Sequence, residues 1–250
     1  MRRDPRGDLA GRHRRGEKAV WRLKYTGLYY ERVRPFDIMV CASRSFVGAG
    51  IRTFSMVDGR PAVWSHCGQV IVRDGKLVIS EANYPRHAYT PVEDYLRADA
   101  AGDVRCCFLR IRESVWDCNL PGLVQARREC LHYHNVECEG RKYTAGIFLP
   151  MAGWSMVRNL TPFFRGRYES IPDEEWEKIF VCSHIIDMGW VFGQAVTGWD
   201  WFPSSLHKFV ASPEDIFASK ALFFVQGWIP EKIPLKEASN DGIARTISAG

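Results

Sequence analysis

The pattern of apolar and polar positions is clearest between residues 65 and 83, which read SHCGQVIVRDGKLVISEAN. Two apolar runs flank Asp74 and Gly75. An Asp-Gly pair between such runs is the strongest short-range signal of a β-hairpin, because both central residues of a type I′ turn need a positive φ. With these two residues as the loop, Arg73 faces Lys76 across the strands. The pattern therefore predicts a hairpin of defined register.

This register decides which side chains of the hairpin share a face. Gly68 would lie opposite Glu81, and His66 opposite Asn83, and alternate residues of a strand return to the same face. His66 and Glu81 are then diagonal neighbours roughly 7–8 Å apart at the backbone, with space left between them by Gly68. Cys67 points to the other face, as a small apolar core residue. Either Glu81 or Asn83 would orient the imidazole, which suits His66 to act as a general base.

Elsewhere the periodicity predicts strands and helices in an irregular order. Such an order favours an α+β fold over a doubly wound parallel sheet. The predicted strands are a short buried one that follows a loop within 33–43, one at 104–111 and a final one that ends near residue 228. The predicted helices are 45–54, 90–100, 121–138 and one or two within 171–196.

Length and charge bear on the domain organisation. A chain of 250 residues that is 46% hydrophobic suits one sizeable core, expected over 19–235. Residues 1–18 carry seven basic and three acidic side chains and are predicted to be a disordered tail; residues 236–250 form a second tail. Because most of the net charge of +5 lies in the first tail, the body is nearly neutral. We expect no specific nucleic-acid binding, and at most a weak attraction of the tail to anionic membranes.

The compartment and the cofactors follow from what the sequence lacks. It contains no apolar run of about 18 residues and no apolar segment after the basic N-terminus. Eight cysteines are too few for a disulfide scaffold of this length. We therefore expect a cytoplasmic protein with reduced thiols. Phosphate-loop, dinucleotide and CxxC motifs are absent from the sequence, so no cofactor is predicted.

A general base needs a group to deprotonate, and Cys182 in IFVCSHII is the best candidate. An apolar approach meets Ser183 and a helical run at this point, so the sulfur would lie in the first turn of a helix. There the exposed N–H groups and the helix dipole lower the pKa of a thiol. His184 is a poor base for Cys182, since residues i and i+2 do not face each other on a helix. Cys182 with His66 would form an activated nucleophile.

The order of these motifs resembles the circularly permuted papain-like branch of the NlpC-type cysteine peptidase and amidase superfamily. These are the YiiX-like proteins, which are related to lecithin:retinol acyltransferase. Three residues depart from the family pattern: Phe36 stands at a family glycine, His184 at the usual Glu after Cys-Ser, and Thr144 at the Asp after the tyrosine. The matching segments span about residues 35–225 and read FDIMV, SHCGQVIV, VISEA, RKYTAGI, VCSHII and SPEDIFAS.

The resemblance implies a permuted papain-like fold, with an antiparallel sheet or partial barrel packed against helices. It implies Cys182 as nucleophile, His66 as base and Glu81 as the orienting residue, with Tyr143 as an aromatic residue of the site. The expected activity is that of an amidase, peptidase or acyl-ester hydrolase with an acyl-enzyme intermediate. Its substrate would be an amide or ester, such as a peptide, a peptidoglycan stem or a lipid. Asn83 and Ser183 are candidates for site-supporting residues.

Other interpretations stay open at this point. The same nucleophile would serve an acyltransferase. A papain-like module without activity could instead bind a lipid, peptide or glycan, with a groove lined by the aromatic residues of 154–168 and 190–202.

A metal site is the last interpretation to be weighed. Cys130, His132, His134 and Cys138 form C-x-H-x-H-x3-C, which matches no common zinc spacing. Ligands spread over two helical turns cannot all reach one ion, so no metal site is predicted.

Overall fold

The structure, a computed structural model, describes most of the predicted elements. Both predicted tails, the expected helix at 45–54 except residue 52, the two aromatic stretches and most of 171–196 lie outside the described residues. Those described are 19–43, 52, 62–111, 121–144, 181–183, 185, 186, 189, 213–217, 219 and 222–234.

The chain divides into two compact units. One is formed by 25–229, and the other combines 1–24 with 230–250. In this second unit the structure describes residues 19–24 of β1 (Ala19–Tyr25) and residues 230–234 of β7 (Leu222–Pro234). The candidate chemistry lies entirely in the first unit.

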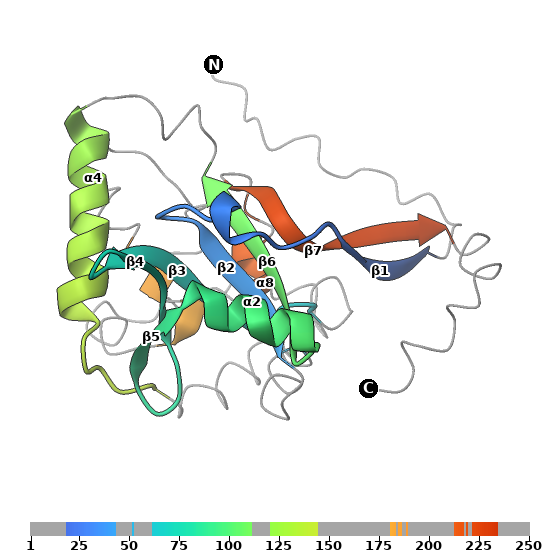
Figure 1. Cartoon of the computed structure of the whole chain (residues 1–250), viewed down its shortest axis with the longest axis horizontal. Helices are drawn as coiled ribbons and strands as arrows, with labels where there is room; N and C mark the ends of the chain where they lie inside the picture. The colour runs from blue at the N-terminus through green and yellow to red at the C-terminus, as the bar shows by residue number, and fades with distance from the viewer. Residues whose placement is uncertain are drawn as a thin grey trace, which may run out of the picture. The chain divides into compact units, whose positions relative to one another are not determined.

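In the part of the chain that the structure describes, the fold is built on a seven-stranded, mostly antiparallel sheet, with few helices (Figure 1). Its strand order is β1-β7-β6-β2-β3-β4-β5. The pairings β2·β3, β2·β6, β3·β4, β4·β5 and β6·β7 are all antiparallel. This arrangement is compatible with the predicted α+β class. The remaining strands are β2 (Ile38–Ser43), β3 (His66–Arg73), β4 (Lys76–Ala82), β5 (His87–Pro91) and β6 (Val104–Ile111).

The hairpin of β3 and β4 has the predicted register. Arg73 pairs with Lys76, and Gln69 pairs with Ser80. Asp74 and Gly75 have φ of 51° and 74°, as a type I′ turn requires. The sequence prediction of this hairpin is confirmed.

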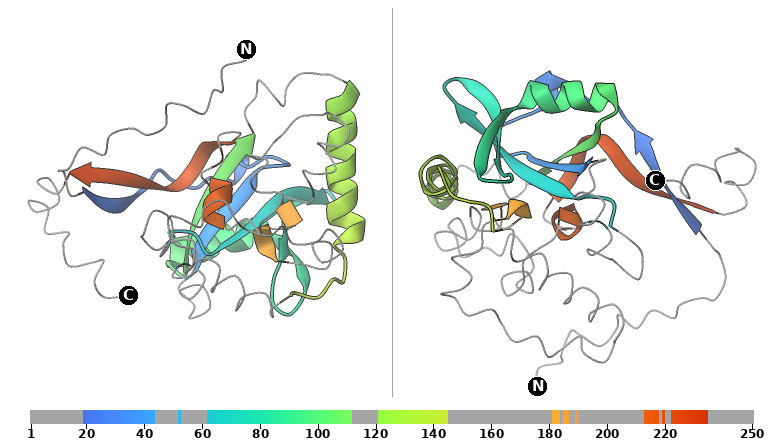
Figure 2. Two further views of the ribbon diagram at one scale, coloured as in Figure 1. Left: turned by 180° about the vertical axis from the view of Figure 1, so that it is seen from behind. Right: turned by 90° about the horizontal axis from the view of Figure 1, so that it is seen from below.

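Helices cover the two faces of the sheet (Figure 2). α2 (Val92–Ala101) lies on one face, above a core that contains Met39, Val70 and Phe108. On the other face, Ile38, Val40, Cys67 and Leu109 pack with Cys182, Ile185 and Ile186 and with α8 (Pro213–Phe217). This separation follows from strand alternation, which sends neighbouring residues to opposite cores. The other helical elements are η1 (Tyr30–Arg32), α4 (Pro121–His132) and the π-helical turn η2 (Tyr133–Glu137).

The boundaries of α2 follow from its end residues. Glu93 and Asp94 lie in its first turn, where negative charge interacts favourably with the helix dipole. Gly102, with φ of 81°, ends the helix in the left-handed conformation that is common at this position. None of the helices among the described residues is long and apolar enough to cross a membrane.

The loop before β2 has an unusual backbone. Phe36 adopts a φ of 72°, a conformation that favours glycine. Its N–H donates to the Val70 carbonyl at 2.7 Å. The next residue, Asp37, is fully buried and accepts two hydrogen bonds from Arg110, at 2.7 and 2.9 Å. These contacts join the start of β2 to β3 and β6.

Gly68 permits the close packing of β3 against the side chains of β4. A Cβ at this position would collide with Cγ2 of Ile79 and lie 3.1 Å from both the Glu81 Cβ and the Ser80 carbonyl oxygen. We expect Gly68→Ala to lower the free energy of unfolding by about 1–3 kcal/mol, the usual effect of overpacking. Urea denaturation measures this change.

Gly75→Asn is the matched control for Gly68→Ala. Nothing lies within 4 Å of a Cβ at Gly75, and asparagine tolerates the positive φ of this turn. Its unfolding free energy should change by less than about 0.5 kcal/mol. Equal effects of the two substitutions would contradict the packing argument.

Candidate active site

Cys182 begins a helical segment, as predicted. Cys182, Ser183, Ile185, Ile186 and Gly189 have helical backbone, and the N–H of Ile185 donates to the carbonyl of Val181 at 3.2 Å. The sulfur therefore belongs to the first turn, where backbone N–H groups lack partners within the helix. Cys182 is only 4% exposed.

His66 connects Cys182 to Glu81. It is the first residue of β3, and its Nε2 is hydrogen-bonded to Oε2 of Glu81. The ring also interacts with the Cys182 side chain, both by a hydrogen bond and by charge attraction. The structure thus brings together Cys182, His66 and Glu81, the three residues that the sequence singled out.

Glu81 is buried and held by groups from two further elements. Tyr95 in α2 donates to Oε2 at 2.6 Å, and Thr90 in β5 donates to Oε1. Asn83, the other candidate for orienting His66, is exposed. Sequence reasoning missed Tyr95 and Thr90. The role of Thr90 follows only from the pairing of β5 with β4, which makes Thr90 a diagonal neighbour of Glu81.

The charged forms of Glu81 and His66 stabilise each other. Burial would raise the pKa of Glu81, but the hydrogen bond and charge of His66 lower it below its ordinary value. Glu81 is then a carboxylate, which can only accept a hydrogen bond, so Nε2 of His66 carries a proton. Burial opposes charge on His66, yet the attraction of Cys182 and the bond to Glu81 raise its pKa well above 6.5.

The thiol of Cys182 is shifted in the opposite direction. A hydrogen bond from the Cys67 side chain is the largest cause of a Cys182 pKa well below its ordinary value of 9.0. The charge and hydrogen bond of His66 act in the same direction, against burial. Both shifts favour a thiolate–imidazolium pair, which is the reactive form of a cysteine nucleophile.

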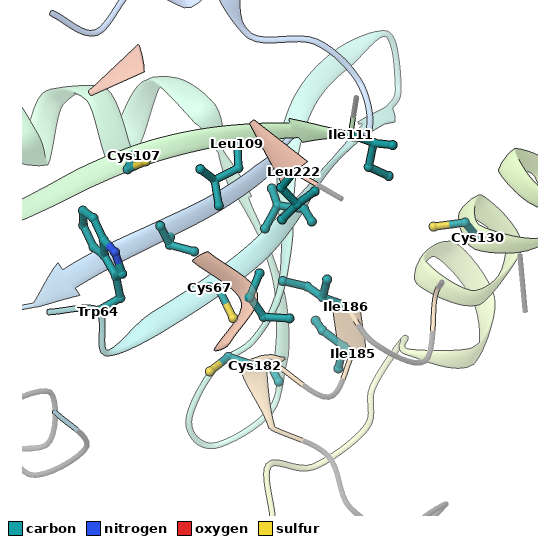
Figure 3. Close-up of a cluster of buried hydrophobic side chains, with 14 of the residues drawn as sticks. Trp64, Cys67, Cys107, Leu109, Ile111, Cys130, Cys182, Ile185, Ile186 and Leu222 are labelled. Carbon is teal, nitrogen blue, oxygen red and sulfur yellow. The ribbon is translucent and has the colours of Figure 1, made fainter. Parts of the chain in front are cut away.

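Cys67 also takes part in this arrangement, which the sequence did not predict. Strand alternation does direct Cys67 to the face opposite Glu81, where it is fully buried. The helix that begins at Cys182 packs on that same face, and Figure 3 shows the Cys67 sulfur directed toward Cys182. The prediction that Cys67 is a small buried core residue is confirmed. Its position beside Cys182 was not predicted, because the hairpin pattern does not show which helix covers that face.

Tyr143 and Ser183 also lie near the sulfur. Tyr143 is half-buried and packs against the core that contains Cys67 and Cys182. Its pKa is raised by burial first, and then by the charges of Cys182 and Cys67. The N–H of Tyr143 donates to the Pro85 carbonyl at 2.9 Å, which places this residue beside the end of β4. Ser183 follows Cys182 in the helix and is buried.

Cys130, His132, His134 and Cys138 do not lie on one continuous α-helix. α4 ends at His132, and the wider π-helical turn η2 changes the spacing that follows. His132 is exposed, whereas His134 is fully buried with Nδ1 2.8 Å from the Ser80 hydroxyl. Burial lowers the pKa of His134 to about 3. Across the described ranges, no three His, Cys, Asp or Glu side chains are grouped to hold a metal ion.

The chain was also compared with known proteins. No model of a protein family matches it, and no curated protein is similar to it at a significant level.

Proposed function

We propose that this protein is a cysteine-nucleophile hydrolase that cleaves an amide or ester through an acyl-enzyme. The observation that carries the proposal is the contact of Cys182, in the first turn of a helix, with an imidazole that a buried carboxylate holds. Cys182 would be the nucleophile, His66 the general acid and base, and Glu81 the residue that positions the ring.

The first half of the reaction would form a thioester. The Cys182 thiolate attacks the carbonyl carbon, and the carbonyl oxygen becomes an oxyanion. N–H groups of the first helical turn, at Cys182 and Ser183, would stabilise that charge. Because Glu81 occupies Nε2 of His66, the other ring nitrogen, Nδ1, is left to protonate the leaving amine or alcohol.

The second half would release the acyl group. His66, now neutral, removes a proton from water, and the resulting hydroxide attacks the thioester carbonyl. The carbon–sulfur bond then breaks, the carboxylic acid leaves, and the thiolate–imidazolium pair returns. An acceptor other than water would make the same site an acyltransferase, and the products of turnover distinguish the two.

The assignment to the permuted papain-like family is part of this proposal. It is supported by the order of the elements: a His strand, a Glu strand, Tyr143, the helix of Cys182, α8 and the last strand. Further support comes from Phe36, whose positive φ occurs where the family has glycine. A substrate of the peptide, peptidoglycan-stem or lipid class remains an expectation from the resemblance.

Thiol alkylation against pH tests the proposed function. We expect the rate at which iodoacetamide modifies Cys182 to fall much less on acidification below pH 9 than the rate of an ordinary thiol, because the pKa of Cys182 lies well below 9.0. Peptide mapping locates the label, and p-nitrophenyl acetate should leave an acetyl group on Cys182.

Cys182→Ser is the control, since it should lose both modifications. A folded wild-type protein whose Cys182 reacts only near the ordinary thiol pKa would contradict the hydrolase. That result would favour a binding module on the same scaffold.

A further inference from the structure

The sulfur of Cys182 has a second cysteine as its immediate neighbour. Hydrogen bonding from the side chain and the backbone of Cys67 is a cause of the lowered pKa of the Cys182 thiol. The two residues belong to the same buried cluster, and Figure 3 shows their side chains at the junction of β3 with the helix. Thus a buried thiol lies against the proposed nucleophile itself.

We propose that Cys182 and Cys67 are a reversible oxidation site, at which a peroxide converts the nucleophile into a Cys67–Cys182 disulfide. The proposal rests on the proposed function, because it concerns the same sulfur. The structure favours Cys67 over the other cysteines of the cluster. Cys107 lies on the same face of the sheet as Cys67, but in β6. Val40 in β2 pairs with Cys67 on one side and with Cys107 on the other. Cys107 is buried, and burial is the cause of its raised pKa.

The chemistry proceeds in two balanced steps. The Cys182 thiolate attacks one oxygen of hydrogen peroxide, the O–O bond breaks, and hydroxide leaves, so Cys182 becomes a sulfenic acid. Cys67 sulfur then attacks the Cys182 sulfur, the S–O bond breaks, and the oxygen leaves as water with the Cys67 proton. Peroxide gains two electrons, and each cysteine sulfur gives up one. A dithiol reductant reverses the reaction by thiol–disulfide exchange.

The asymmetry of the two thiols matches these roles. Peroxide reacts with a thiolate, and Cys182 is the one held in that form. Burial and the bond to Cys182 raise the pKa of Cys67 well above 9.0, so Cys67 stays a thiol until a sulfenic acid forms beside it. The disulfide would remove the nucleophile while protecting Cys182 from irreversible oxidation to a sulfinic acid.

Mass mapping of the full chain after peroxide treatment tests the site. We expect a non-reducing digest to contain the Cys67 and Cys182 peptides joined, and dithiothreitol to restore iodoacetamide labelling of Cys182. In Cys67→Ser the hydroxyl keeps a hydrogen-bond donor but cannot form a disulfide. Its Cys182 should instead accumulate sulfinic acid, with at least about a tenfold smaller recovery of label. Cys107→Ser should behave as the wild type.

Each outcome decides the question. Rapid labelling of Cys182 before treatment, followed by sulfinic acid without a disulfide in the wild type, would overturn this inference and leave the hydrolase standing. A disulfide between Cys182 and any other cysteine would also overturn it. Slow labelling before treatment counts against the hydrolase itself. If circular dichroism shows Cys67→Ser to be unfolded, Cys67→Ala takes its place, and the wild-type disulfide map still decides.

Discussion

Replacing His66 by asparagine will slow the alkylation of Cys182 by iodoacetamide at about pH 6 by about 10- to 100-fold. His66 supplies the positive charge and a hydrogen bond that keep Cys182 ionised. Without them the pKa of Cys182 rises and the fraction of thiolate at this pH falls, although the hydrogen bond from Cys67 still lowers that pKa. The greater nucleophilicity of a more basic thiolate offsets part of the loss. Rates at several pH values, with the label located by mass mapping, measure the effect.

His132→Asn is the matched control for this substitution. His132 ends α4, is exposed, and lies outside the group around Cys182. Its replacement should leave the alkylation rate of Cys182 within about a factor of two of the wild-type rate. If His66→Asn were folded and equally reactive, the thiolate would depend on Cys67 and the helix alone, and His66 would not be the base.

Replacing Glu81 by alanine will lower the free energy of unfolding by about 3–5 kcal/mol, as expected when one partner of a buried ion pair is removed. Glu81 is fully buried and accepts hydrogen bonds from His66, Thr90 and Tyr95. Its loss leaves two hydroxyl groups and a charged ring without their acceptor. Urea denaturation near pH 6 measures the change.

Two milder variants serve as controls for Glu81→Ala. Tyr95→Phe removes one of the three hydrogen bonds and should cost about 1 kcal/mol. Glu93→Ala replaces an exposed carboxylate in α2 and should change stability by less than about 0.5 kcal/mol. Equal effects of Glu81→Ala and Glu93→Ala would show that the buried pair does not stabilise the fold.

The stability that His66 and Glu81 contribute depends on pH, and the directions of their pKa shifts determine how. The pKa of His66 is raised, so its contribution is complete below 6.5 and is lost as pH rises through the folded-state pKa. The pKa of Glu81 is lowered, so its contribution is complete above 4.5 and is lost as pH falls through the folded-state pKa. The stability difference between wild type and Glu81→Gln should therefore be largest between pH 4.5 and 6.5.

Local chemistry was enough to predict the hairpin and the position of Cys182. A type I′ turn needs residues that accept a positive φ, and Asp74-Gly75 provides them within two positions. Because the side-chain period of a strand is two, this turn also places His66 and Glu81 on one face. The apolar run after Cys182 likewise indicates a helix start. These are interactions between near neighbours, so the residues themselves carry the information.

Two strands were missed because their evidence is not local. β5 (His87–Pro91) is a short edge strand with polar residues, and it forms only because β4 offers unpaired backbone groups. β1 (Ala19–Tyr25) alternates charged and apolar residues beside a basic segment and pairs with β7, which lies some 200 residues later. Without β5, the role of Thr90 in holding Glu81 could not be inferred.

The sequence by itself determined the hairpin register, the α+β order of elements and the three residues Cys182, His66 and Glu81 as the candidate chemistry. Only the tertiary structure decided that Glu81 rather than Asn83 contacts His66, and that Cys67 lies against Cys182. The physical reason is the range of the interactions. Turn and strand periodicity act between neighbouring residues, whereas the surroundings of a sulfur depend on which helix packs on which face of the sheet.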